Sequence, residues 1–142
     1  MANNNTCSCS CNCNTGEGND KCVTNLTKNK VYACGGASNV GMISFELAKT
    51  LHLENHYKMG CASGVAAGEF EVQNTIQQEG NQDLVIDGCP ISCVQKIFEQ
   101  KGIEGFKHII VTEFGINKEA AFNFEPATIK QLIDKIKQHY KI

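Results

Sequence analysis

Residues 84–93 read Leu-Val-Ile-Asp-Gly-Cys-Pro-Ile-Ser-Cys and contain the sharpest structural boundary in the chain. The apolar run Leu84–Ile86 is typical of a strand buried on both faces, and the turn residues Asp87–Cys89 interrupt it. Pro90 suits the first position of a helix, where its missing amide costs nothing. Apolar residues then recur at helical spacing, at Ile91, Val94 and Phe98. This stretch predicts a strand, a glycine turn and a helix.

The same succession occurs twice before this segment. Val31–Ala33 form a short apolar run that stops at Cys34–Gly36, and a helical apolar face follows at Val40, Ile43, Leu47 and Leu51. Residues 56–60 predict a second strand that ends at Cys61, and a second helical face follows at Val65, Glu69, Val72 and Ile76. Alternating strands and amphipathic helices are the pattern of βαβ units.

The pattern ends with a fourth strand, predicted at Ile109–Val111, and a terminal helix opened by Pro126. The apolar stripe of that helix is formed by Ile129, Leu132, Ile133, Ile136 and Tyr140. We therefore expect an α/β fold of three layers, with a mostly parallel four-stranded sheet and helices on both faces. The first and third strands should be adjacent, because that order creates a switch point.

Length and composition indicate one folded domain after a polar tail. The chain has 142 residues, and residues 1–30 are rich in Asn and Cys with too few apolar side chains to form a core. We expect residues 1–30 to be disordered and residues 31–142 to fold. Residues 1–6 lack the features of a secretory signal and no segment is long enough to span a bilayer, so we expect a cytoplasmic protein.

The charged residues argue against several classes of partner. The net charge is −2, and all 13 cationic residues are lysines. This balance offers no electrostatic footprint for nucleic acid or for an anionic membrane. The absence of arginine also disfavours phosphoryl chemistry that depends on a guanidinium group.

Nine cysteines are the outlier of the composition. In a reducing cytoplasm, a cysteine-rich chain is more often a metal or redox protein than a disulfide scaffold. Cys34, Cys61 and Cys89 each end a different predicted strand, and Cys93 follows Cys89 by about one helical turn. Because parallel strands lie about 4.8 Å apart and end at one edge, the four thiols could converge there.

Four convergent thiolates repel one another unless a cation offsets their charge. Zinc fits this role with four Cys ligands, and an iron–sulfur cluster also takes four thiolates. Any one of these cysteines could be a small buried apolar residue, but four near the same edge of the sheet favour a metal site. The candidate ligands are Cys34, Cys61, Cys89 and Cys93.

The residues around these cysteines resemble a known family. The segments are Ala33–Ser38 (Ala-Cys-Gly-Gly-Ala-Ser), Met59–Gly64 (Met-Gly-Cys-Ala-Ser-Gly) and Ile86–Cys93 (Ile-Asp-Gly-Cys-Pro-Ile-Ser-Cys). Together they resemble the DGC domain family of zinc-binding proteins, which is named for its Asp-Gly-Cys motif. The resemblance extends over residues 31 to about 118 and implies that the four cysteines form the zinc site. It implies no particular activity.

Other chemistry-bearing residues carry weaker expectations. Asp87 should cap turn amides rather than act as a base, because an anion beside thiolates is unfavourable unless it is hydrogen-bonded. The histidines should be surface or packing residues away from the site; they are His52, His56, His108 and His139. The tail cysteines could wrap a soft ion such as Zn(II) or Cu(I), or be incidental; they are Cys7, Cys9, Cys11, Cys13 and Cys22.

Two classes of function remain. The first is binding of zinc or another thiophilic metal, for storage, delivery or sensing. The second is a thiol-based redox or sulfur-transfer enzyme in which Cys89 is the nucleophile and Cys93 resolves it. The Cys-x3-Cys spacing and the lack of a nearby histidine weigh against the enzyme. Metal binding is therefore the leading hypothesis.

Overall fold

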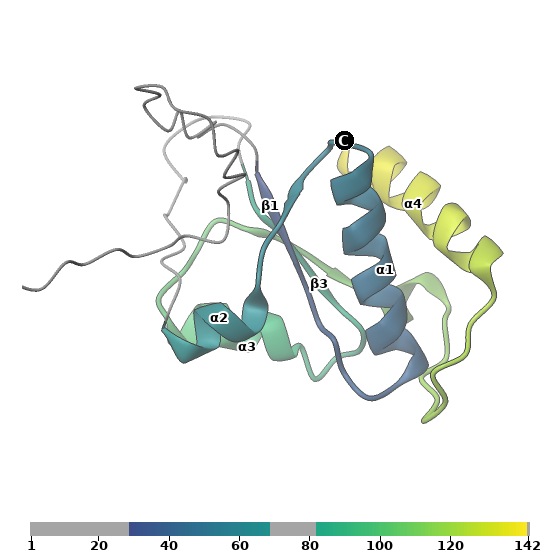
Figure 1. Ribbon diagram of the computed structural model, residues 1–142, viewed down its shortest axis with the longest axis horizontal. Helices are drawn as coiled ribbons and strands as arrows, with labels where there is room; N and C mark the ends of the chain where they lie inside the picture. The colour runs from purple at the N-terminus through teal and green to yellow at the C-terminus, as the bar shows by residue number, and fades with distance from the viewer. Residues whose placement is uncertain (1–28, 69–81, 142) are drawn as a thin grey trace, which may run out of the picture.

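The computed structural model describes residues 29–68 and 82–141, so the expectations about tail residues 1–28 lie outside this part of the chain. The predicted end of the tail at residue 30 is too late, because Lys30 is the first residue of the first strand. Four parallel strands form one sheet in the order β2-β1-β3-β4 (Figure 1). They are β1 (Lys30–Ala33), β2 (Lys58–Met59), β3 (Leu84–Asp87) and β4 (Lys107–Ile110). The predicted parallel sheet is confirmed, and β1 pairs directly with β3.

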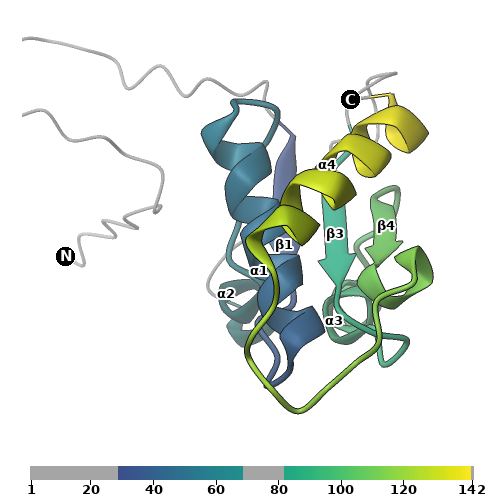
Figure 2. The ribbon, with the colours of Figure 1, turned by 90° about the vertical axis from the view of Figure 1, so that its right-hand side faces the viewer.

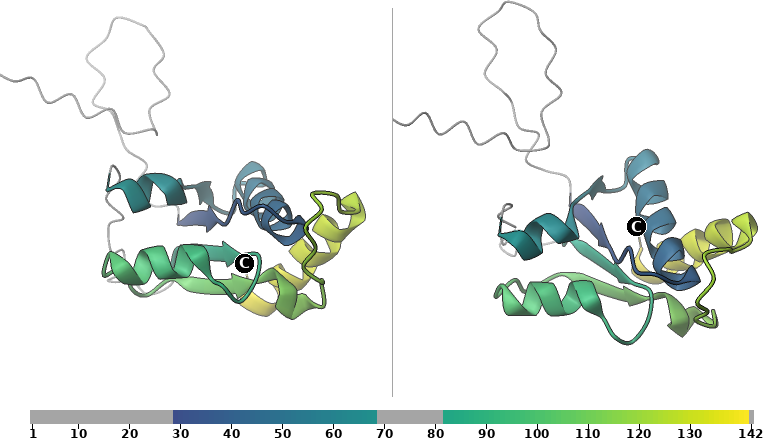
Figure 3. Two further views of the ribbon diagram at one scale, coloured as in Figure 1. Left: turned by 90° about the horizontal axis from the view of Figure 1, so that it is seen from below. Right: turned by 60° about the horizontal axis from the view of Figure 1, so that its bottom comes forward.

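Helices cover both faces of this sheet (Figures 1 and 3). One face carries α1 (Asn39–Leu53) and α4 (Pro126–Tyr140), and the other carries α2 (Ala62–Ala67) and α3 (Cys93–Gln100). The first layer buries Ile43, Leu47 and Ile136 against the sheet. The second packs Phe98 edge-on against Tyr32, with ring centroids 4.9 Å apart. The predicted three-layer fold is therefore confirmed.

The chain reverses direction across the sheet between β1 and β3. From β1 it passes through α1 to β2, and from β3 it passes through α3 on the opposite face to β4. Figure 2 shows β3 and β4 pointing toward the same end of the molecule, where the loops to α1 and α3 lie. In open α/β sheets, ligands bind in the crevice outside the carboxyl ends of the strands at such a switch point.

The third helix begins later than the sequence predicts. Pro90 and Ile91 lie in a turn, and α3 starts at Cys93. The reason is Ser92, whose φ of 53° is left-handed and cannot belong to a helix. The expectation that Ile91 belongs to the inner face is wrong, since its side chain is 54% exposed. Cys89 and Cys93 therefore do not share one helix.

Two other boundaries differ from the prediction. Strand β4 ends at Ile110, and Val111 opens the 3-10 helix η1 (Val111–Phe114) instead of continuing the strand. Of the predicted second helical face the structure describes only Val65, which is buried in α2; this helix ends at Ala67, because Gly68 takes the left-handed conformation of a helix C-cap. Glu69, Val72 and Ile76 of that face lie outside the described residues.

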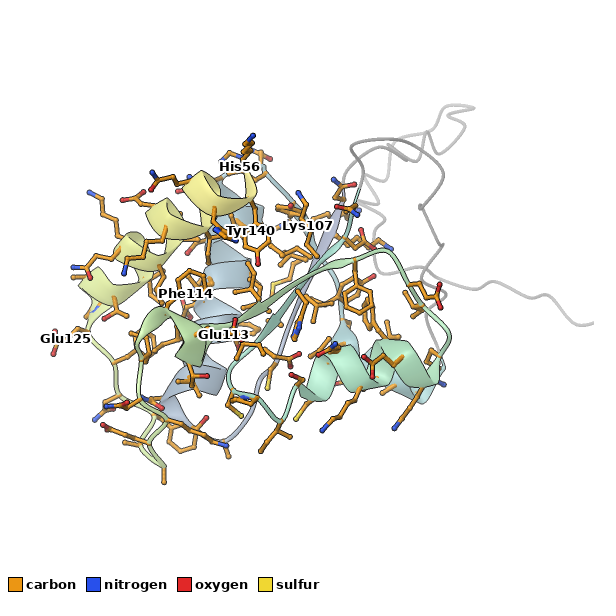
Figure 4. The ribbon with its side chains drawn as sticks, turned by 180° about the vertical axis from the view of Figure 1, so that it is seen from behind. His56, Lys107, Glu113, Phe114, Glu125 and Tyr140 are labelled. Carbon is orange, nitrogen blue, oxygen red and sulfur yellow. The ribbon has the colours of Figure 1, made fainter. Side chains whose placement is uncertain are left out.

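The last helix, α4, is hydrogen-bonded to the edge strand β4. The Tyr140 hydroxyl donates to the His108 carbonyl oxygen of edge strand β4 at 3.0 Å. Figure 4 shows Lys107 at the amino end of β4, and Glu113 and Phe114 beyond its carboxyl end. No helix within the described part of the chain is long and apolar enough to cross a membrane.

Candidate functional site

The four candidate cysteines lie at or near the carboxyl ends of the strands. Cys34 directly follows β1, Cys61 follows β2 after one glycine, and Cys89 follows β3 after one glycine. Cys93 is the first residue of α3. All four are free thiols. They thus occupy the edge of the sheet at which an α/β fold binds ligands.

Three of these thiols lie on the two sides of the switch point, Cys34 after β1 and Cys89 and Cys93 after β3. They are close enough for the charges of Cys34 and Cys89 to act on the Cys93 thiol. Burial, followed by the charges of Cys34, Asp87 and Cys89, raises the pKa of the Cys93 thiol. Removal of the thiol from water is the larger cause of this rise, and the neighbouring negative groups add to it. A bound cation would reverse the sign of that interaction.

Cys61 has a different set of contacts. It is the N-cap of α2, where its sulfur accepts a hydrogen bond from the Gly64 amide at 3.3 Å, and it is exposed. After burial and Asp83, its charge also raises the pKa of Tyr32. In the residues described, 29–68 and 82–141, no three His, Cys, Asp or Glu side chains are already arranged to hold a metal ion.

Backbone contacts fix the position of Cys34. Its amide donates to the Ile86 carbonyl oxygen at 2.9 Å, which extends the pairing of β1 with β3 by one residue. Its carbonyl oxygen accepts from the Ser44 hydroxyl on α1. A Cβ on Gly36 would lie 3.3 Å from the Cys34 sulfur, so the backbone passes close to this thiol. Such an approach suits a loop that wraps a ligand atom.

Asp87 links β3, β4 and α3 from a fully buried position. Its carboxylate accepts from the amides of Val94 at 2.9 Å and Gln95 at 3.1 Å, and it contacts the His108 ring nitrogen Nε2 at 2.9 Å. These amides belong to the first turn of α3, which has no side-chain cap from Ser92. Asp87 is therefore a capping residue, as expected, although it caps a helix and not the adjacent turn.

The expectation for His108 is wrong. The sequence places it at a strand start away from the site, but β4 begins one residue earlier, at Lys107, and His108 aligns with Val85 of β3. That register brings its ring to Asp87, and its side chain is only 19% exposed. His108 therefore contacts Asp87, the residue that caps α3, instead of lying apart from the site. The other histidines, His52, His56 and His139, are exposed.

Lys118 is a further residue of the site. Its ammonium group lies 3.4 Å from the Cys89 sulfur, to which it donates a hydrogen bond. The loop that carries it is held by Asn39 at the start of α1, which accepts from the Glu119 amide at 2.8 Å and donates to the Asn117 carbonyl oxygen at 2.9 Å. The loop of Lys118 therefore contacts the loop that follows β3 through Cys89, and the start of α1 through Asn39.

Comparison with known proteins places the chain in a family. The model of the DGC domain matches residues 30–136. The chain belongs to the DGC domain family. No curated protein and no solved structure matches the chain. The resemblance drawn from the three cysteine segments is thus confirmed.

The candidate site residues differ in how visible they are in the sequence. Cys34, Cys61 and Cys89 fall in the short segments of the DGC domain that follow β1, β2 and β3, where the end of an apolar run is visible in the sequence, and Cys93 follows Cys89 by four residues at the start of α3. Lys118 lies in an irregular loop 29 residues from Cys89, and no periodicity marks it. The register of β4 with β3, which would have revealed His108, depends on pairing that a single sequence does not specify.

Proposed function

We propose that this DGC domain binds a zinc ion, or another thiophilic metal ion, at the carboxyl edge of its sheet, in storage, delivery or sensing. Cys34, Cys61, Cys89 and Cys93 would hold the ion. The observation that carries the proposal is that four free thiols follow β1, β2 and β3 at one edge of a parallel sheet, on both sides of the switch point between β1 and β3.

The chemistry of the donor set supports a soft or borderline cation. Thiolates favour Zn(II), Cu(I) and iron–sulfur clusters, whereas Mg²⁺ and Ca²⁺ need oxygen ligands. The one carboxylate beside the thiols, Asp87, already receives two amide hydrogen bonds and the His108 contact. Asp87 would therefore orient Cys93 through α3 and leave coordination to sulfur.

Cys61 supports the proposal by position alone. It lies beyond the carboxyl end of β2, the neighbour of β1, and its sulfur faces the first amides of α2. The amide that donates to this sulfur would also support the sulfur as a metal ligand. As an exposed residue at the start of a short helix, Cys61 is the ligand whose contribution needs a direct test.

The alternative is a thiol enzyme that uses Cys89 as nucleophile. The Lys118 ammonium beside the Cys89 sulfur favours this reading, since a neighbouring cation activates a thiol. In this alternative Cys93, four residues further along the chain at the start of α3, would resolve Cys89.

The deciding experiment is elemental analysis of anaerobically purified protein, together with its visible spectrum. We expect about one equivalent of zinc and a colourless protein, whereas an iron–sulfur cluster would give visible absorption. Serine at any of positions 34, 61, 89 or 93 should lower the metal content. Cys22→Ser is the matched control, because Cys22 lies outside the matched residues 30–136. Full metal content in Cys89→Ser would contradict the proposal and favour the thiol enzyme.

A further inference from the structure

Two neighbours of Lys118 are clamped by one buried asparagine. Asn39 is only 7% exposed and uses its side-chain oxygen and nitrogen to bind Glu119 and Asn117, the residues on either side of Lys118. The Asn39 amide also donates to the Glu119 carbonyl oxygen at 3.2 Å. The loop has no helix or strand between Gly115 and Glu125. Its backbone is nevertheless held on both sides of Lys118, the residue that contacts Cys89.

The clamp joins this loop to the same helix end that borders Cys34. Asn39 is the first residue of α1, and Ser38 caps that helix by accepting from the Gly41 amide at 3.3 Å. Asn39 therefore connects the loop after β1 with the loop of Lys118. Because Asn39 holds the residues on both sides of Lys118, the backbone position of Lys118 depends on it directly.

The positive charge of Lys118 opposes the negative charge of the cysteine cluster. Zinc with four thiolates carries a net negative charge, and buried Asp87 lies beside Cys93. Excess negative charge weakens the binding of each thiolate to the ion. An ammonium group that donates to a ligand sulfur offsets this charge and orients the sulfur.

We propose that Lys118, held in place by Asn39, is a positioning residue of the thiol site: its ammonium group donates to the Cys89 sulfur and balances the charge of the ligand set. This inference rests on the proposed function for its consequence in metal binding. The contact between Lys118 and Cys89 is itself a property of the metal-free protein, so it can be tested without an ion.

The first measurement is zinc affinity, by competition with a chromophoric chelator at fixed pH and salt. Lys118→Gln should weaken binding about 10- to 100-fold, the usual cost of removing a group that supports a metal ligand. Lys118→Arg should retain most of the affinity, since it keeps the charge and the donor. Lys96→Gln is the matched control, because Lys96 is an exposed lysine three residues after Cys93.

The second measurement uses metal-free protein and two alkylating reagents. The rate at Cys89 is followed by mass spectrometry with iodoacetate, which is anionic, and with iodoacetamide, which is neutral. The rate with iodoacetate divided by the rate with iodoacetamide reports the local charge, because the reactivity of the sulfur itself affects both rates alike. Lys118→Gln should lower this ratio about two- to five-fold, as expected for removing one partly solvated charge. Asn39→Ala should lower it too, although Lys118 remains.

The two measurements separate the two hypotheses. If zinc binds and neither measurement responds to Lys118→Gln, the inference is overturned and the proposed function stands. If wild-type protein binds no zinc but the ratio falls, the proposed function fails and the contact of Lys118 with Cys89 is upheld. An unchanged ratio in Lys118→Gln overturns the inference whether or not zinc binds.

Discussion

Gly88 has a steric role between β3 and Cys89. A Cβ built on it would lie 2.8 Å from the carbonyl carbon and oxygen of Val40, so the backbones of the β3 loop and α1 are in direct contact. Gly41 similarly brings α1 against the backbone of Gly36. The loops that carry Cys34 and Cys89 therefore both pack, through glycines, against the first turn of α1, and this shared contact fixes where each loop lies.

We predict that Gly88→Ala lowers the free energy of unfolding by about 1–3 kcal/mol, because the new methyl group collides with main-chain atoms that cannot move aside. Urea denaturation measures the change. Gly35→Ala is the matched control, since a Cβ at Gly35 meets nothing within 4 Å. That variant should be unchanged or slightly more stable, through the smaller entropy of its unfolded chain. Equal losses in both variants would contradict the steric role.

A second prediction at the residue scale concerns alkaline pH. Burial, followed by the charges of Asp83 and Cys61, raises the pKa of the Tyr32 hydroxyl. Above about pH 10 the unfolded chain releases this proton while the folded protein keeps it, so stability falls as pH rises. Tyr32→Phe keeps the ring against Phe98 but removes the proton.

The Phe variant should therefore lose less stability than the wild type between about pH 8 and pH 11. Urea unfolding at several pH values measures the difference. Some loss should remain in the variant, because burial also raises the pKa of Tyr57 and Tyr140. Parallel pH profiles for the two proteins would show that Tyr32 has no part in the effect.

At the scale of elements, the start of α3 shows what sequence reasoning could and could not supply. The apolar positions Val94 and Phe98 are buried as predicted, because their spacing is a local property. The helix start was misplaced, because Pro90 is equally suited to a turn and the left-handed Ser92 leaves no pattern. The true cap comes from Asp87, whose carboxylate reaches amides seven and eight residues along the chain.

We predict that Asp87→Asn destabilises the protein by about 1–3 kcal/mol, because it weakens charge-assisted hydrogen bonds in a buried place. The amide protons of Val94 and Gln95 should exchange faster with solvent, which hydrogen exchange by NMR measures residue by residue. Asp134→Asn is the control, because Asp134 is an exposed residue of α4, and it should change stability by less than about 0.5 kcal/mol. Unaltered exchange at Val94 would exclude Asp87 as the cap.

At the scale of the whole molecule, the parallel sheet was predictable because each strand and its following helix are neighbours in sequence. The order of β1 and β3 follows from the same rules of connection. The site required more, since Lys118 and His108 reach it from a loop and a strand that are distant in sequence. Their contacts exist only once three layers have packed. The four cysteines could be identified because three of them follow strands and the fourth, Cys93, is only four residues beyond Cys89.

Because the thiols come from separate elements, a shared ion should stabilise the assembled fold. Binding to the native state alone adds about 2.7 kcal/mol when free zinc is 100 times its Kd, so Tm should rise by several degrees on loading and fall on chelation. Differential scanning calorimetry measures both. The tail cysteines are replaced by serine in a parallel sample, and the shift should persist there, since it arises within residues 30–136. In Cys89→Ser the shift should shrink or vanish. A chelator that leaves Tm unchanged in wild-type protein shown to contain zinc would mean that the ion does not join these elements.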